Sequence, residues 1–154
     1  MIKLSSSALK KITDAAVQAY PHECCGLLAG RRYSDASSSV SCVVPSSNVA
    51  AGKTHDSFEV DPQVRFDLMR KLDDAGSGEE IIGHYHSHPN HPAQPSARDL
   101  AMAYEPDLIW VIVAVRDGQA TETTAHVLEA DGSQFQQIPL SILDNPSSKE
   151  SDTP

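Results

Sequence analysis

Basic residues, aromatic residues and long apolar segments are all scarce in this 154-residue sequence. Lys and Arg number 12 against 21 Asp and Glu, which gives a formal charge of −9. Because nucleic-acid binding usually needs a basic patch, this balance disfavours a nucleic-acid partner. No window approaches the roughly 20 apolar residues of a membrane span, and the N-terminal segment lacks the apolar run of a signal peptide. We therefore expect neither a nucleic-acid nor a membrane partner.

Cysteine is also scarce: the chain has three, and two of them, Cys24 and Cys25, are adjacent. Adjacent cysteines pair only with strain, so a disulfide framework is disfavoured and the reducing cytoplasm is the expected location. The run around them is apolar and has no nearby cation, which is typical of buried structural thiols. A cysteine nucleophile or a Cys/His zinc site is the less favoured interpretation of this pair.

The length fits a single domain that can bury a hydrophobic core. Three segments of the sequence predict helices. Residues 5–20 place apolar side chains at helical spacing behind serines that can cap them. A second helix is expected over residues 62–75, because Asp61 can cap it and Gly76 can end it. The segment 95–104 predicts a short third helix.

Strand signals are mixed with the helical ones, which indicates an α+β protein. The expected strands are residues 24–30, 40–45, 79–88, 107–115, 120–130 and 134–143. The fourth is almost wholly apolar and predicts a central strand covered on both faces. Asp117-Gly118 after it predicts a hairpin turn, and the last segment is expected at a sheet edge. The domain should span residues 1–143, and residues 144–154, which lack an apolar pattern, should form a disordered tail.

Four of the seven histidines fall within the stretch IIGHYHSHPNHPAQPSARD, residues 81–99. Alternate side chains of a strand share a face. One face would then carry Ile82, His84, His86 and His88, and the other Ile81, Gly83, Tyr85 and Ser87. Two histidines that are two apart in a strand lie about 6.6 Å apart at their Cα atoms, so their imidazoles can converge on one metal ion.

Strand geometry alone allows two ligand pairs, His84 with His86 or His86 with His88. The strand begins among apolar residues and becomes more polar toward Pro89. The second pair is therefore better placed to leave a metal position open to a substrate. His91 lies beyond Pro89 in a loop, and the pattern gives it no fixed position.

Asp99 offers a third ligand. A loop of ten residues separates it from His88, which is long enough to turn back on the strand end, and the next helix would present Asp99 in its first turn. Two histidines and one carboxylate, with water in the fourth position, form the pattern of a catalytic zinc site. The alternative is that Ser96 and Asp99 only form a capping box at a helix start.

A metal-dependent hydrolase also needs a base, and Glu23 is a candidate. It lies between a helix end and the apolar strand that starts at Cys24. A carboxylate is unfavourable in such an apolar setting unless it has a specific function. The alternative is that Glu23 is simply exposed in a loop.

Together these residues resemble the JAMM, or MPN-plus (Mov34/MPN/PAD-1), zinc metallopeptidase family. The family pattern is a glutamate, then His-x-His-Pro, then an aspartate with a serine three residues before it, and here it reads Glu23, HSHP and PSARD. The resemblance covers residues 1 to about 140 and implies a mixed, mostly antiparallel, curved sheet flanked by helices, similar to that of cytidine deaminases. The small chain is most similar to the stand-alone prokaryotic members.

The resemblance implies roles for five residues. His86, His88 and Asp99 would bind one zinc ion (Zn2+), with a water as the fourth ligand. Glu23 would hold and deprotonate that water, which is the nucleophile. Ser96 would donate a hydrogen bond to the oxyanion of the tetrahedral intermediate. The pattern assigns nothing to the remaining histidines.

The resemblance also implies a substrate: the amide bond after the C-terminal Gly-Gly of a ubiquitin-like or sulfur-carrier protein. A flexible tail of this kind can add as a strand at a sheet edge. The alternative is a non-catalytic MPN scaffold that binds a ubiquitin-like partner, which the presence of all five catalytic positions disfavours. The sequence leaves the oligomeric state open, a homodimer included.

Other metal hydrolases fit poorly. A metallo-β-lactamase motif would need His-x-His-x-Asp-His, and HSHPNH lacks the aspartate. An amidohydrolase barrel also uses His-x-His, but this chain is too short to build eight β/α units.

Overall fold

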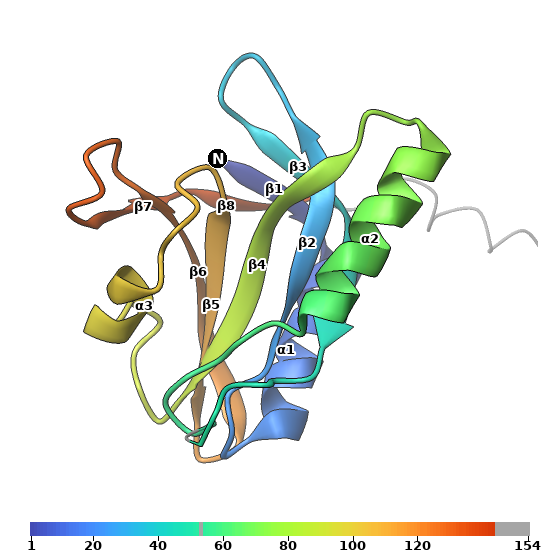
Figure 1. The fold of residues 1–154 in the computed structure, drawn as a ribbon. Coiled ribbons are helices and arrows are strands. Elements are labelled where there is room, and N and C mark those ends of the chain that lie inside the picture. Colours follow the sequence, from blue (N-terminus) through green and yellow to red (C-terminus); the bar gives the residue numbers. More distant parts are fainter. Residues whose placement is uncertain (53, 144–154) are drawn as a thin grey trace, which may run out of the picture.

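One eight-stranded sheet with helices on both faces forms the molecule, as the computed structural model of residues 1–52 and 54–143 shows (Figure 1). The strands are β1 (Ile2–Ser5), β2 (Cys25–Arg32), β3 (Ser38–Ser46), β4 (Glu80–Pro89), β5 (Ile109–Arg116), β6 (Gln119–Leu128), β7 (Phe135–Ile138) and β8 (Leu140–Leu143). They lie in the order β7-β6-β5-β4-β2-β3-β1-β8. The pairs β4/β5, β1/β3 and β1/β8 are parallel and the other four are antiparallel. The predicted α+β class with a mixed sheet is confirmed.

The helices are α1 (Ser6–Ala19), α2 (Pro62–Ala75) and α3 (Ala97–Ala101). The predicted caps of the first two are confirmed: the Ser5 side chain accepts a hydrogen bond from the Ala8 amide, and Asp61 accepts one from the Gln63 amide. Gly76 ends α2 in the left-handed conformation at φ 61°, which glycine adopts without a steric penalty. The third helix is shorter than predicted. None of the helices in the described ranges has the length and apolarity needed to cross a membrane.

The sheet curves until its two edges approach each other (Figure 1). Its edge strands β7 and β8 are consecutive in the chain, and only Pro139 separates them. The Pro139 carbonyl accepts a hydrogen bond of 2.9 Å from the Ile2 amide, which starts the β1/β8 pairing. The sequence predicted one edge strand over residues 134–143, and β1 was not predicted, because a four-residue strand carries little periodicity.

Each face of the sheet has its own apolar core. The main core packs α1 against the sheet through Ile12, Leu28, Tyr85 and Val111, and a smaller core packs Leu68 of α2 against the opposite face. Strand β5 is buried along all but its last residue, as predicted. The Asp117-Gly118 hairpin turn is also present, and both residues have positive φ.

A β-bulge in β4 corrects the predicted division of its side chains between the two faces. Leu28 pairs with Gly83 but Ala29 pairs with Ile81, so Ile82 is an extra residue in β4. The bulge turns Ile82 into the main core, whereas Ile81 packs in the smaller core on the α2 side. The prediction that Ile82 shares a face with the histidines is therefore wrong. The alternation holds beyond the bulge, from Gly83 onward.

The single domain over residues 1–143 stays a prediction. The predicted tail, residues 144–154, lies outside the described residues.

Candidate active site

The site lies where β4 ends and β2 begins. Because β2 and β4 are antiparallel, Cys25 at the start of β2 pairs with His86 near the end of β4. Glu23, two residues before Cys25, therefore reaches the same end of the sheet as His86 and His88. The chain then leaves β4 at Pro89, loops back and enters α3.

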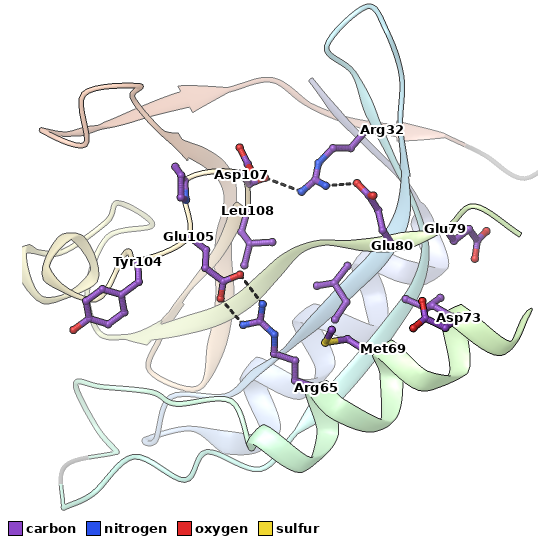
Figure 2. A pocket seen from close by; sticks show the side chains of 13 residues that line it. Arg32, Arg65, Met69, Asp73, Glu79, Glu80, Tyr104, Glu105, Asp107 and Leu108 are labelled. Atoms are coloured by element: carbon purple, nitrogen blue, oxygen red, sulfur yellow. Dashed lines mark hydrogen bonds and ion pairs between the residues drawn. The ribbon is translucent and has the colours of Figure 1, made fainter. Parts of the chain in front are cut away.

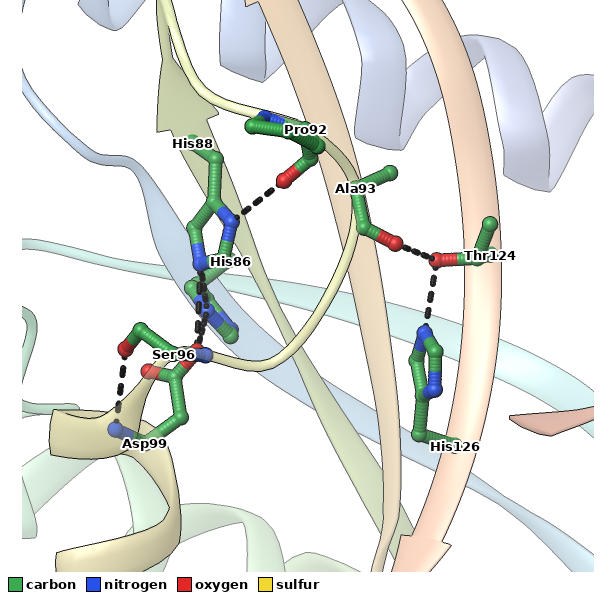
Figure 3. A network of polar contacts seen from close by, with 8 residues as sticks. All are labelled: His86, His88, Pro92, Ala93, Ser96, Asp99, Thr124 and His126. Carbon is green, nitrogen blue, oxygen red and sulfur yellow. Dashed lines mark hydrogen bonds and ion pairs between the residues drawn. The ribbon is translucent and has the colours of Figure 1, made fainter. Parts of the chain in front are cut away.

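The three predicted metal ligands converge (Figure 3). The Nε2 atoms of His86 and His88 are 2.9 Å apart. Asp99 Oδ2 lies 3.3 Å from His86 Nε2 and 3.1 Å from His88 Nε2. All three residues are buried, with exposed fractions of 0%, 7% and 5% for His86, His88 and Asp99. The structure thus brings together the pair His86/His88, and not His84/His86, with Asp99.

These separations suit a metal ion. In a tetrahedral zinc site with bonds of about 2.0–2.1 Å, ligand atoms lie about 3.3–3.4 Å apart. The two nitrogens and the carboxylate oxygen are close to this spacing, and a cation between them would compensate their burial. Three protein ligands leave one coordination position for another group, which is the arrangement of catalytic zinc sites.

The imidazole of His88 is held by the loop that follows it. Its Nδ1 lies 2.8 Å from the Pro92 carbonyl oxygen, so Nδ1 carries the hydrogen and donates it. In the neutral imidazole the lone pair is then on Nε2, which faces Asp99 and His86. A backbone carbonyl that fixes the tautomer of a histidine in this way is the usual second partner of a metal-ligating histidine.

The imidazole of His86 is held differently. It stacks on Phe58, with ring centroids 4.2 Å apart and an interplanar angle of 15°. Its Nδ1 is buried and has no hydrogen-bond partner among the described residues. Phe58 was missed at the sequence level, because nothing in the pattern of residues 57–62 relates it to a strand that begins 22 residues later.

One oxygen atom of Asp99 contacts both the start of α3 and the two histidines. Its Oδ2 accepts a hydrogen bond of 2.9 Å from the Ser96 amide, and its own amide donates one of 3.0 Å to Ser96 Oγ. This is the predicted capping box. Burial favours protonation of Asp99, but the contacts with His86 and His88 outweigh it and hold the pKa of Asp99 well below its ordinary value. The carboxylate is therefore ionised, and the two interpretations of Ser96 and Asp99 are compatible.

Ser96 is exposed beside the buried Asp99. Its hydroxyl oxygen accepts from the Asp99 amide, which leaves the hydroxyl hydrogen free to donate. A donor of this kind at the edge of the site can reach a negatively charged oxygen of a substrate.

Glu23 is buried, with 4% of its surface exposed, so the alternative of an exposed loop residue is wrong. Its amide donates to the Thr54 carbonyl at 2.7 Å, and its carbonyl accepts from Asn48 Nδ2 at 3.1 Å. The next residue, Cys24, exchanges two hydrogen bonds with Ser87, of 2.8 and 3.2 Å. Four hydrogen bonds thus fix the backbone that carries this carboxyl.

The carboxyl of Glu23 faces the histidines. One of its oxygens lies within 4.8 Å of ring nitrogens of His86 and His88. Its Oε2 is buried and has no hydrogen-bond partner in the described part of the chain. Burial is the main cause that raises the pKa of Glu23 to about 8, and the neighbouring charges act less strongly. A carboxyl whose pKa lies near neutrality can both accept and release a proton.

The other histidines and the cysteines lie outside this cluster. His84 is buried against Trp110, with ring centroids 4.3 Å apart, and burial lowers its pKa to about 3, so it is neutral. His91 is exposed. Cys24, Cys25 and Cys42 are free. Burial raises the pKa of Cys25 to about 12, which fits the predicted structural thiol.

A groove leads from the site across the face of the sheet, between α2 and the segment after α3. Near Asp99 it is a cavity of about 300 Å³ that Phe58 and Met102 line. Both residues also line a second cavity of about 390 Å³, which extends over Trp110. A third cavity of about 440 Å³ continues beyond Arg65. The cavities share lining residues, so they form one groove.

An ion pair crosses this groove (Figure 2). Arg65 of α2 contacts Glu105 through two parallel pairs of atoms, Nη1–Oε1 and Nη2–Oε2, each 2.5 Å apart. Both residues line the second and the third cavity, so the pair stands where these two meet. The side chains are 39% and 47% exposed, and a pair this exposed can part at little cost.

Comparison with known proteins confirms the predicted family. The family of prokaryotic homologues of the JAB domain matches residues 5–128. The desampylase of Haloferax volcanii is 34% identical over 136 residues, which cover 88% of this chain and 89% of the relative. The CysO-cysteine peptidase of Mycobacterium tuberculosis is 30% identical over 125 residues, which cover 81% of this chain and 80% of the relative.

Solved structures confirm the fold. A protein of Desulfitobacterium hafniense superposes with a TM-score of 0.80 at 26% identity, over 99% of this chain and 100% of the other. A protein of Salinibacter ruber gives 0.67 at 33% identity, over 94% and 93%. A JAB1/MPN domain protein of Archaeoglobus fulgidus gives 0.55 at 19% identity, over 94% and 98%, and shows likeness of fold alone.

Proposed function

Because this chain belongs to the family of prokaryotic JAB-domain proteins and is a hydrolase of the JAMM type, we propose that it is a zinc-dependent peptidase or isopeptidase. It hydrolyses the amide bond after the C-terminal Gly-Gly of a ubiquitin-like or sulfur-carrier protein. The observation that carries the proposal is the convergence of His86 Nε2, His88 Nε2 and Asp99 Oδ2 beside Glu23, whose Oε2 has no hydrogen-bond partner within the described residues.

In this proposal His86, His88 and Asp99 hold one zinc ion. A bound zinc ion would supply a water of lowered pKa at neutral pH and a positive charge near the scissile carbonyl. The choice of zinc rests on the ligand set, because two imidazoles and one carboxylate at tetrahedral spacing suit this metal. The Pro92 carbonyl supports the assignment, since it accepts the Nδ1 hydrogen and leaves Nε2 as the atom of the neutral His88 imidazole that can bind a metal.

In this proposal Glu23 transfers the proton of the attacking water, and Ser96 stabilises the negative charge that forms on the substrate. Glu23 accepts a proton from the attacking water as the oxygen forms its bond to the carbonyl carbon. The same carboxyl then releases the proton to the leaving nitrogen as the C–N bond breaks. Burial raises the pKa of this carboxyl to about 8 in the metal-free protein, and the positive charge of a bound zinc ion would lower that pKa, which favours the ionised form that accepts the proton. Ser96 donates its free hydroxyl hydrogen to the oxyanion of the tetrahedral intermediate.

The groove supports a substrate with a narrow, extended tail. Phe58, which stacks on His86, lines the groove where it meets Asp99. A Gly-Gly tail has no side chains to clash there. The relatives support this substrate class, because their names are desampylase and CysO-cysteine peptidase. The partner is thus a ubiquitin-like or sulfur-carrier protein. The cytoplasmic location and a homodimer stay predictions.

The test is an incubation with ubiquitin-like proteins that carry residues beyond a C-terminal Gly-Gly, with the products read by mass spectrometry. We expect cleavage directly after Gly-Gly with zinc present, and none after chelation until zinc is restored. Glu23→Gln should bind zinc and leave the substrate intact. A zinc-loaded protein that binds such partners without cleaving any of them would instead support the non-catalytic scaffold.

A further inference from the structure

A chain of hydrogen bonds joins β6 to the loop between the metal-ligating elements (Figure 3). Thr124 Oγ1 donates to the Ala93 carbonyl at 2.6 Å, and it lies 2.8 Å from His126 Nε2. Thr124, His126 and Ala93 have exposed fractions of 6%, 4% and 1%. A buried polar chain of this kind is stable only when each group is satisfied.

The direction of the chain follows from its chemistry. A carbonyl oxygen only accepts, so the single hydroxyl hydrogen of Thr124 points at Ala93. The hydroxyl oxygen then accepts from His126, which must carry its hydrogen on Nε2. Burial lowers the pKa of His126, and its neutral form with a hydrogen on Nε2 satisfies this need.

The loop that this chain anchors has contacts with the proposed ligands at both ends. Pro92, next to Ala93, accepts the hydrogen of His88 Nδ1. Ser96, three residues after Ala93, caps the helix that presents Asp99. Ala93 packs on Ile112 and Ala114 of β5 but has no polar partner there. At the start of the loop, the Asn90 amide donates to the Val115 carbonyl of β5 at 2.6 Å. The hydrogen bond from Thr124 adds a second attachment to the sheet, at Ala93, between Asn90 and α3.

We propose that Thr124 and His126 are positioning residues for the metal site: their hydrogen-bond chain holds the 90–96 loop so that His88 from β4 and Asp99 from α3 meet. The inference rests on the proposed metal site and extends it to a strand that is not adjacent to β4 in the sheet. Neither residue is one of the proposed metal ligands, so each would act through the loop.

Matched substitutions separate positioning from packing. Thr124→Val keeps the shape and removes the hydroxyl, whereas Thr124→Ser keeps the hydroxyl and removes a methyl group. At the other end of the chain, His126→Gln keeps a donor near the position of Nε2, and His126→Leu removes it. Thr123→Val is the control, because Thr123 pairs with Val113 and faces the main core instead.

The primary measurement is the zinc dissociation constant, by competition with a chromogenic chelator. We expect Thr124→Val and His126→Leu to weaken binding about tenfold, at the lower end of the 10–100-fold range for residues that orient a ligand. Thr124→Ser, His126→Gln and Thr123→Val should stay within about twofold of the original protein. In ¹H–¹⁵N spectra of the imidazoles, Thr124→Val should also reduce the share of the His88 tautomer that is protonated at Nδ1.

The outcomes distinguish the two proposals. An original protein that binds no zinc would contradict the proposed function. The positioning role would be overturned if the original protein binds zinc, Thr124→Val binds it equally well and Thr124→Ser binds it worse. In that case packing of the methyl group, and not the hydroxyl, would be what the site needs. A melting temperature for each variant shows that the comparison is made on folded protein.

Discussion

We expect Glu23→Gln to change how stability depends on pH, in addition to removing activity. Burial raises the pKa of this carboxyl from 4.5 to about 8 in the folded protein. Between these two values the unfolded chain has lost the proton and the folded chain still holds it. The unfolded state then binds fewer protons, so the free energy of unfolding falls as the pH rises, by about 1.4 kcal/mol per pH unit. Below pH 4.5 and above pH 8 the contribution is constant.

The size of the effect is bounded by the structure. From pH 4.5 to pH 7 the wild-type protein loses at most about 3 kcal/mol through this group. The carboxyl adjoins the open side of the metal site, where water screens part of its charge, so we expect about 1–2 kcal/mol. Glutamine has nearly the same shape and does not titrate. The difference in stability between the two proteins should therefore change with pH by that amount, in favour of Glu23→Gln as the pH rises.

Urea unfolding at a series of pH values, in chelator, measures this difference. Trp110 is the single tryptophan and is 3% exposed, so its fluorescence reports unfolding. Glu122→Gln, at an exposed position of β6, controls for the loss of one charge. Parallel stability curves for the original protein and Glu23→Gln between pH 4.5 and pH 8 would refute the account of Glu23 as a desolvated carboxyl. In the zinc-loaded enzyme, loss of the base should lower kcat by about 10²–10⁴-fold.

Two further substitutions test the scaffold and the groove. Gly26→Ala should lower the free energy of unfolding by about 1–3 kcal/mol, because a Cβ there would overlap the buried ring of Tyr85. Thermal or urea unfolding measures this change, and an unchanged stability would show that the ring can shift. Glu105→Gln should lower KM with kcat unchanged, because it removes the ion pair with Arg65 that crosses the groove the tail would enter. The decrease should be up to about fivefold, since an exposed ion pair contributes at most about 1 kcal/mol. Steady-state kinetics with the tail-extended substrate test this, and an unchanged KM would mean that the tail takes another path.

Local signals in the sequence were sufficient for much of the fold. The caps Ser5 and Asp61 and the stop at Gly76 were all predicted, because each acts within one turn of its own helix. The convergence of His86, His88 and Asp99 was predicted from two local signals. Spacing allowed two histidine pairs and limited where the aspartate could lie, and the increase in polarity toward Pro89 favoured the pair His86/His88.

Features that depend on contacts between distant segments were not predictable in this way. The bulge at Ile82 has no marker in its own strand, because the extra residue is defined only by the pairing of β4 with β2. Phe58 stacks on His86, and Thr124 reaches Ala93, across 28 and 31 residues of chain. Such contacts become visible only when the strand order is known.

The double use of Asp99 Oδ2 shows why a local interpretation of Ser96 and Asp99 left two alternatives. A capping box fixes the Asp99 carboxylate toward the start of α3, and the same oxygen then points at His86 and His88 because α3 begins above the end of β4. The helix start is thus the device that orients the proposed ligand. It follows that the Ser96 amide and a bound metal would each use one of the two lone pairs of Asp99 Oδ2. A change in the position of α3 would therefore alter the site without any change in its ligands.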